Sequence, residues 1–139
     1  MPSIQIETCT LNELTNHIYL RCKKLGNSHD ITDEDKIRDI TKTIVYFYRK
    51  YHEVIGKHHP ILSDKALEWV FVNYFFIPKL LEPYSISTFD DYKELIDSYF
   101  KVQYGKHKKS GVVPDYSLSH FMSEEIRVNL AKNTFNIPH

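Results

Sequence analysis

The segment between Ile37 and Tyr51 constrains the fold of this chain more than any other feature. Its apolar residues recur every three or four positions, the spacing of one face of an α-helix: Ile37, Ile40, Ile44, Phe47, Tyr48 and Tyr51. Thr32 precedes Asp33, Glu34 and Asp35, so a capping residue is followed by three acids at the positive end of the helix dipole. Gly56 supplies a stop signal. The pattern predicts a long amphipathic helix that must bury one face against other elements.

Four more segments carry helical spacing and capping residues, so we expect an all-α bundle of about five helices. They lie at about 11–25, 63–77, from 88 past 100, and 117–134. Thr10 and Glu13 are placed as a capping box for the first, with Gly26 as its stop, and Ser63 and Thr88 can cap the next two. Ser123, followed by two glutamates, has the pattern of a second N-cap inside the last segment, which predicts two short helices with a bend. Only 4 glycines and 6 prolines leave little room for the turns of an all-β protein.

The segment at about 63–77 is apolar nearly all round, from Leu67 and Trp69 to Ile77. A helix of this kind is normally the largely buried centre of a bundle. The same apolar surplus would also suit the seam of a homodimer. Pro78 is expected to end or kink the helix, because its ring removes a donor and clashes with the preceding turn.

The chain has the size of one domain, so we expect a single helical domain over residues 1–139, with residues 1–9 loosely ordered before the first helix. Its longest charge-free apolar run, 69–77, is far shorter than the about 20 residues of a membrane span. The N-terminus has no basic leader and no apolar stretch of a signal peptide. Cys9 and Cys22 form no Cys-x-x-Cys motif and are expected to be reduced thiols. These features indicate a cytoplasmic protein without a membrane partner.

No motif for catalysis or cofactor binding is present. The chain lacks a Gly-x-Ser-x-Gly elbow, a Walker A loop and a dinucleotide fingerprint. The dipeptide His29-Asp30 is found in HD phosphohydrolases, but it stands between two helices, where Asp30 is better explained as a turn residue. His58 and His59 are adjacent and point in different directions on a regular element, so they suit a metal poorly. We expect no catalytic residue, no metal and no cofactor. A metal-dependent hydrolase that uses the histidines is a further alternative.

The remaining signal is basic and aromatic, in a chain whose formal net charge is +0. The stretch 101–109 has four lysines and no acid, and its candidate binding residues are Lys101, Tyr104, Lys106, His107, Lys108 and Lys109. Its beginning suits a helix C-terminus, whose dipole favours cations, whereas 106–115 is expected to be a loop. Arg49, Lys50 and Lys57 form a second basic group, and a third is Arg21, Lys23 and Lys24. If these groups share a face, lysines would neutralise phosphates and Tyr104 would stack on a base.

Two classes of function therefore stay open. The first is a non-enzymatic protein that binds nucleic acid or a nucleoprotein complex. The second is a protein-interaction module, or an inhibitor of a host protein, because the chain is neutral and rich in tyrosine, a residue favoured at interfaces. Tyr46, Tyr84 and Tyr104 are the tyrosines expected at the surface.

Three segments, taken in order and spacing, carry a resemblance to a known group of proteins. They are Gly-Lys-His-His-Pro-Ile-Leu-Ser at 56–63, Tyr-Lys-Glu-Leu-Ile-Asp-Ser-Tyr-Phe at 92–100, and Asp-Tyr-Ser-Leu-Ser-His-Phe at 115–121. Over roughly residues 45–128 the chain resembles small uncharacterised or replication-associated proteins of bacteriophages and Gram-positive mobile elements. The resemblance implies a mobile-element setting, with host machinery or nucleic acid as partner, and it carries no catalytic residue across.

Overall fold

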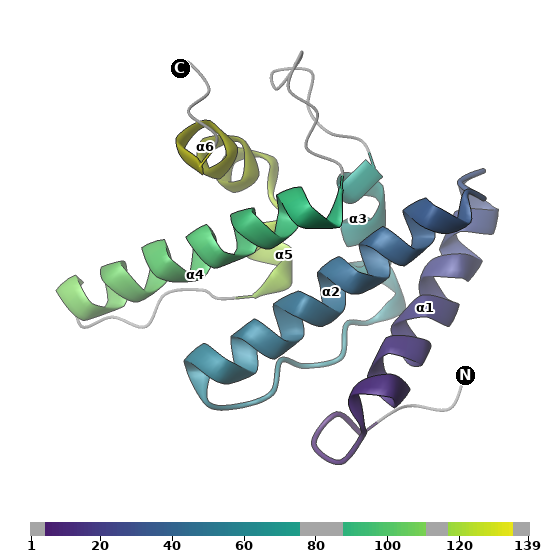
Figure 1. Cartoon of the computed structure of the whole chain (residues 1–139), viewed down its shortest axis with the longest axis horizontal. Helices are drawn as coiled ribbons and strands as arrows, with labels where there is room; N and C mark the ends of the chain where they lie inside the picture. The colour runs from purple at the N-terminus through teal and green to yellow at the C-terminus, as the bar shows by residue number, and fades with distance from the viewer. Residues whose placement is uncertain (1–4, 76–87, 111–116, 135–139) are drawn as a thin grey trace.

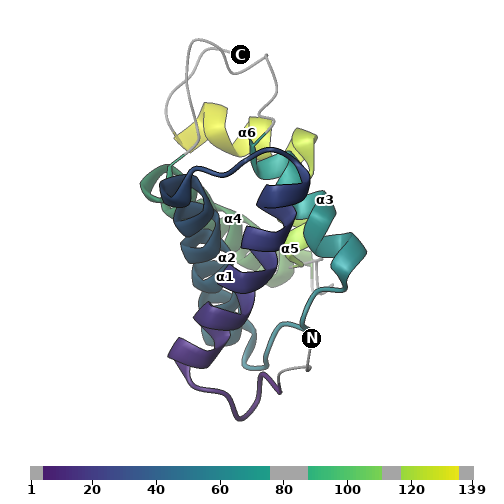
Figure 2. The same cartoon turned by 90° about the vertical axis from the view of Figure 1, so that its right-hand side faces the viewer.

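The computed structural model describes residues 5–75, 88–110 and 117–134, and within these ranges every regular element is an α-helix. The helices are α1 (Leu11–Ser28), α2 (Glu34–Ile55), α3 (Asp64–Phe75), α4 (Phe89–Ser110), α5 (Leu118–Phe121) and α6 (Glu124–Thr134). They pack around one continuous apolar core (Figures 1 and 2). The all-α bundle is confirmed, with six helices in the described ranges where about five were expected. The extra helix arises because the last region divides at Ser123, as its capping signal predicts.

The start of α1 forms as its sequence predicts, but its end does not. Thr10 Oγ1 accepts the Glu13 N–H at 3.1 Å, and the Glu13 carboxylate accepts the Thr10 N–H at 3.2 Å, which completes the capping box. Gly26 does not stop the helix, which continues to Ser28. The glycine is needed there because a Cβ would lie 2.4 Å from the carbonyl oxygen of Ile31, where the chain turns back. Asp30, with a φ of 57°, makes that turn.

The N-cap of α2 is Asp33, not Thr32 as expected. The Asp33 carboxylate accepts the backbone N–H of Asp35 at 2.9 Å, so the first acid is used as the cap and the others occupy the first turn. The helix ends at Gly56, whose φ of 84° is left-handed. The apolar stripe is buried from Ile37 to Tyr48 as predicted, and Tyr51 is half-buried. Helix α2 packs on α1 on one side and on α4 on the other (Figure 1).

Helix α3 supplies buried residues without occupying the middle of the bundle. Leu67, Val70, Phe71 and Tyr74 are buried, whereas the side chain of Trp69 is 42% exposed. An apolar composition does not say which face of a helix is covered, and here α2 takes the position between two neighbours. Residues 76 and 77, which the predicted helix also included, and Pro78 lie outside the described residues.

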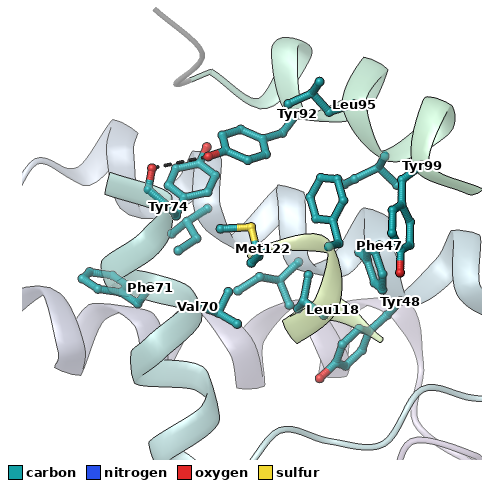
Figure 3. Close-up of a cluster of buried hydrophobic side chains, with 14 of the residues drawn as sticks. Phe47, Tyr48, Val70, Phe71, Tyr74, Tyr92, Leu95, Tyr99, Leu118 and Met122 are labelled. Carbon is teal, nitrogen blue, oxygen red and sulfur yellow. Dashed lines mark hydrogen bonds between the residues drawn. The ribbon is translucent and has the colours of Figure 1, made fainter. Parts of the chain in front are cut away.

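Aromatic rings from distant segments meet in the core (Figure 3). The ring centroid of Phe47 lies 5.0 Å from that of Phe100 and 5.6 Å from that of Phe121, so α2, α4 and α5 converge on it. Tyr74 and Tyr92 stack at 4.4 Å, and the Tyr92 hydroxyl donates to the Tyr74 carbonyl at 3.5 Å. These contacts join α3 to α4 and fix how α4 lies across the bundle.

Helix α4 is longer than expected. Thr88 caps it as predicted, because its Oγ1 accepts the Asp91 N–H at 3.3 Å. However, the segment 106–110, expected to belong to a loop, is helical to Ser110. Residues 111–115, the rest of that expected loop, lie outside the described residues. None of the described helices combines the length and the apolar character that crossing a membrane needs, and both cysteines are free thiols.

Candidate nucleic-acid interface

The helices α2 and α4 lie side by side and run in the same direction, so their C-terminal ends reach the same end of the bundle (Figure 1). The Tyr46 hydroxyl donates a hydrogen bond to Asp97, and Lys50 Nζ lies 3.7 Å from the same carboxylate oxygen. Beyond these contacts the last turns of α4, drawn in light green, extend past the end of α2. We call this region the basic end; it comprises Arg49, Lys50, Lys57, Lys101, Tyr104, Lys106, His107, Lys108 and Lys109.

Of the basic-end cations whose side chains the structure describes, three are open to solvent. Arg49, Lys57 and Lys101 are exposed, and none of them forms a salt bridge with a carboxylate of another described residue. Lys50 differs, because its side chain is only 27% exposed and it faces Asp97. Three of the predicted binding residues are therefore available to an anionic partner, whereas Lys50 also holds α2 to α4.

The helical backbone of 101–110 changes how the predicted basic residues are arranged. In a helix of 3.6 residues per turn, positions 101, 104 and 108 fall along one stripe, and positions 106 and 109 fall along another. A loop would impose no such order. The predicted residues of this tract therefore occupy the last turns of one helix, which extends past the end of α2 (Figure 1).

Acidic residues occupy the opposite ends of the same two helices. Asp33, Glu34 and Asp35 stand at the start of α2, and Asp90 and Asp91 stand in the first turn of α4. Both helices thus begin acidic and end basic, which is the favourable arrangement for each helix dipole. Because the two helices are parallel, the acidic starts of both lie toward one end of the bundle and the basic residues of both lie toward the other.

The third basic group of the sequence does not join the basic end. Helix α1 packs antiparallel to α2, so its C-terminal turns lie at the other end of the bundle (Figure 2). Arg21 is 9% exposed and donates to the Leu62 carbonyl at 2.7 Å and to the Asp64 carboxylate at 3.0 Å. It ties α1 to the start of α3, while Lys23 and Lys24 are exposed far from the other two groups.

An open groove of about 460 Å³ adjoins the basic end on the α1 side of α2. One wall is apolar and comes from the N-terminal segment and the start of α1, with Ile6, Leu11 and Leu14. The other wall is polar and comes from the end of α2 and the following loop: Tyr48, Arg49, His52, Glu53 and His58. Cys9 and Thr10 complete the lining.

Two imidazole rings stack face to face on the polar wall. The ring centroids of His52 and His58 are 4.1 Å apart, and the planes differ by 9°. Gly56 makes this possible, because its left-handed backbone turns the chain back so that His58 lies over the last turns of α2. The sequence does not predict this stack, although the Gly56 stop between His52 and His58 indicates that the chain reverses there.

Two further groups of the groove, the Cys9 thiol and the Tyr48 phenol, have raised pKa values. Burial, and secondarily the charge of Glu13, raises the pKa of the Cys9 thiol, which donates to the Ile6 carbonyl at 3.6 Å. Burial raises the pKa of the Tyr48 phenol to about 12, and its hydroxyl donates to the Pro60 carbonyl at 3.2 Å. Both groups keep their protons at neutral pH, so neither is an activated nucleophile or base.

The other candidate residues of the sequence have structural partners, form no metal-binding group in the described part of the chain, or lie outside it. His59 is buried, and its Nε2 accepts the Leu118 N–H at 3.1 Å. The half-buried Tyr46, expected at the surface, is bonded to Asp97. In the described part of the chain, no three histidine, cysteine, aspartate or glutamate side chains are grouped closely enough to hold a metal ion. Tyr84 lies outside the described residues.

No protein-family model, no curated protein and no solved structure matches this chain. The candidate site therefore rests on the geometry of the basic end and of the groove beside it.

Proposed function

We propose that this protein binds nucleic acid, alone or within a nucleoprotein complex, through the basic end, as a non-enzymatic accessory protein. The observation that carries the proposal is the parallel packing of α2 and α4, which brings two basic groups distant in sequence to one end of the bundle. The mobile-element setting stays a prediction of the sequence resemblance.

The physical basis is charge neutralisation. Each lysine or arginine that contacts a phosphate releases condensed counterions, so affinity falls steeply as salt rises. Because the chain is neutral overall, this attraction acts only near the basic end, and the acidic starts of α2 and α4 repel a polyanion. We therefore expect modest affinity, one orientation of binding and strong dependence on salt.

The proposal is tested by titrating a fluorescently labelled oligonucleotide with the full chain at several salt concentrations. Replacing Arg49, Lys57 or Lys101 singly by alanine should weaken binding to all sequences alike. Each should reduce the slope of log affinity against log salt by about 1 if its phosphate contact is lost. Lys24→Ala, an exposed lysine at the other end of the bundle, is the matched control. Equal slopes for all four variants would refute the assignment of these residues.

A protein partner is the second candidate, favoured by one observation. Trp69 is 42% exposed on the outer face of α3, and tryptophan is enriched among the residues that dominate protein interfaces. A pull-down after nuclease treatment separates the two functions. A partner that survives nuclease and is lost in Trp69→Ala favours the protein-binding function.

A further inference from the structure

We infer that the groove beside Arg49 receives an unstacked base, so that the partner at the basic end is a single-stranded nucleic acid rather than a duplex. The inference rests on the proposed function and deepens it. It starts from the observation that the groove and the basic end share a residue. Arg49 lines the groove and is also one of the exposed cations of the basic end.

The groove has the shape and chemistry that a base requires. Its volume of about 460 Å³ is within the range of small-ligand sites, and it has one apolar and one polar wall. A base has apolar faces and a polar edge, so it suits such a pair of walls. Leu11, whose side chain is 48% exposed, offers a contact for one face of a ring.

The imidazole stack of His52 and His58 offers a flat surface to a base. His52 is exposed and His58 is half-buried behind it, with the two planes nearly parallel. Aromatic rings that present a flat face are the platforms on which proteins stack unpaired bases, without preference for sequence. Here Gly56 and the stacking partner His58 hold the His52 ring, so less side-chain freedom is lost when a base binds.

Two charged side chains of opposite sign, Arg49 and Glu53, line the groove. Arg49 can neutralise the phosphate next to the bound base, whereas the Glu53 carboxylate can only accept hydrogen bonds. A carboxylate in this place repels phosphate but accepts from the amino group of a base edge. In a duplex these edges are paired and the faces are stacked, so only a single strand can offer a base without unstacking cost.

The experiment compares three labelled ligands of one length: a single strand with bases, the same strand made abasic, and the duplex. The full chain should bind the base-bearing strand at least about fivefold more tightly than the abasic strand, the lower end of one stacked base. His52→Ala should abolish this preference and leave affinity for the abasic strand unchanged. His52→Phe should keep the preference, because it retains a flat ring without a titratable nitrogen.

The outcomes separate this inference from the proposed function. Equal, salt-dependent binding of the base-bearing and abasic strands, or tighter binding of the duplex, overturns the base site and leaves the basic end in place. Binding of none of the three ligands overturns both. If His52→Phe loses the preference together with His52→Ala, stacking is not the cause and the inference fails. Unfolding curves of both variants should match that of the parent chain, since His52 is exposed.

Discussion

The ammonium of Lys50 on α2 lies 3.7 Å from Oδ1 of Asp97 on α4, and the same oxygen accepts the hydrogen bond of the Tyr46 hydroxyl. One carboxylate thus links two helices that are separated by more than thirty residues of chain. Phe47, buried beside these residues, packs on Phe100 at a ring distance of 5.0 Å. This parallel packing gives the molecule its basic end, because it directs two helix C-termini toward the same end of the bundle (Figure 1).

Replacing Asp97 by asparagine should strengthen nucleic-acid binding. The amide oxygen can still accept from Tyr46, so the helices stay in register, while a negative charge is removed and Lys50 is released. The pair is partly exposed, so the free energy of unfolding should change by less than about 1 kcal/mol. Titration of a labelled oligonucleotide and urea unfolding measure the two effects. Weaker binding by the folded variant would show that Asp97 contributes to the site instead of opposing it.

Replacing His59 by alanine should destabilise the fold by about 2–4 kcal/mol. The change leaves the Leu118 N–H without its acceptor and removes a ring that stacks on Tyr48 at 4.8 Å. His52→Ala is the matched control, because that ring is exposed and should change stability by less than about 0.5 kcal/mol. Urea unfolding of both variants gives the comparison. A loss for His59→Ala no larger than that of the control would contradict the structural role of this histidine.

Sequence reasoning performs well where the signal is local. The capping box of Thr10 and Glu13 follows from side chains that bond to nearby backbone, and the Gly56 stop follows from the left-handed φ that glycine permits. The division of the last helical region at Ser123 is likewise predicted from the residues beside it. It fails where the cause lies in another element. Gly26 was interpreted as a stop, but it is required by the approach of Ile31, which only the tertiary fold reveals.

The candidate site, too, could be predicted from the sequence only in part. The sequence identifies the basic residues but not whether they share a face, because that depends on the relative direction of α2 and α4. It gives no sign that the Arg21 guanidinium is held by the Leu62 carbonyl and the Asp64 carboxylate of the same chain and is not free for a phosphate of a partner. Ser110-Gly111 and Pro114 predict a loop over 106–115, yet the helix continues to Ser110.

Replacing Gly26 by alanine should destabilise the protein by about 1–3 kcal/mol, although alanine favours helices. The added Cβ would lie 2.4 Å from the Ile31 carbonyl oxygen and 2.8 Å from Cδ1 of Ile37, so backbone must shift. Gly56→Ala offers a contrast, because its Cβ would meet nothing within 4 Å and only the φ of 84° opposes it. Thermal unfolding should show a lower melting temperature for both variants than for the parent chain. A stabilised Gly26→Ala variant would mean that this close approach does not exist in solution.

Stability should decline in alkali. Burial raises the pKa of the Cys22 thiol from 9.0 to about 12 and that of the Tyr48 phenol from 10.0 to about 12. Above pH about 9 the unfolded chain releases these protons while the folded chain keeps them, so the free energy of unfolding falls as pH rises toward 12. Urea unfolding at stepped pH measures the slope, and Cys22→Ala should reduce it. A stability that stays constant between pH 9 and 12 is incompatible with burial of these groups.

The most direct test of the account is a comparison of two triple charge reversals. Lys106, Lys108 and Lys109 are changed to glutamate in one variant. Lys23, Lys24 and Lys36, which are exposed around the opposite end of α2, are changed in the other. The net charge changes equally, so only position differs. The account predicts that the first variant loses nucleic-acid binding by more than about tenfold at moderate salt, while the second keeps most of it. Equal losses in the two variants, or unchanged binding in the first, would contradict the assignment of the basic end.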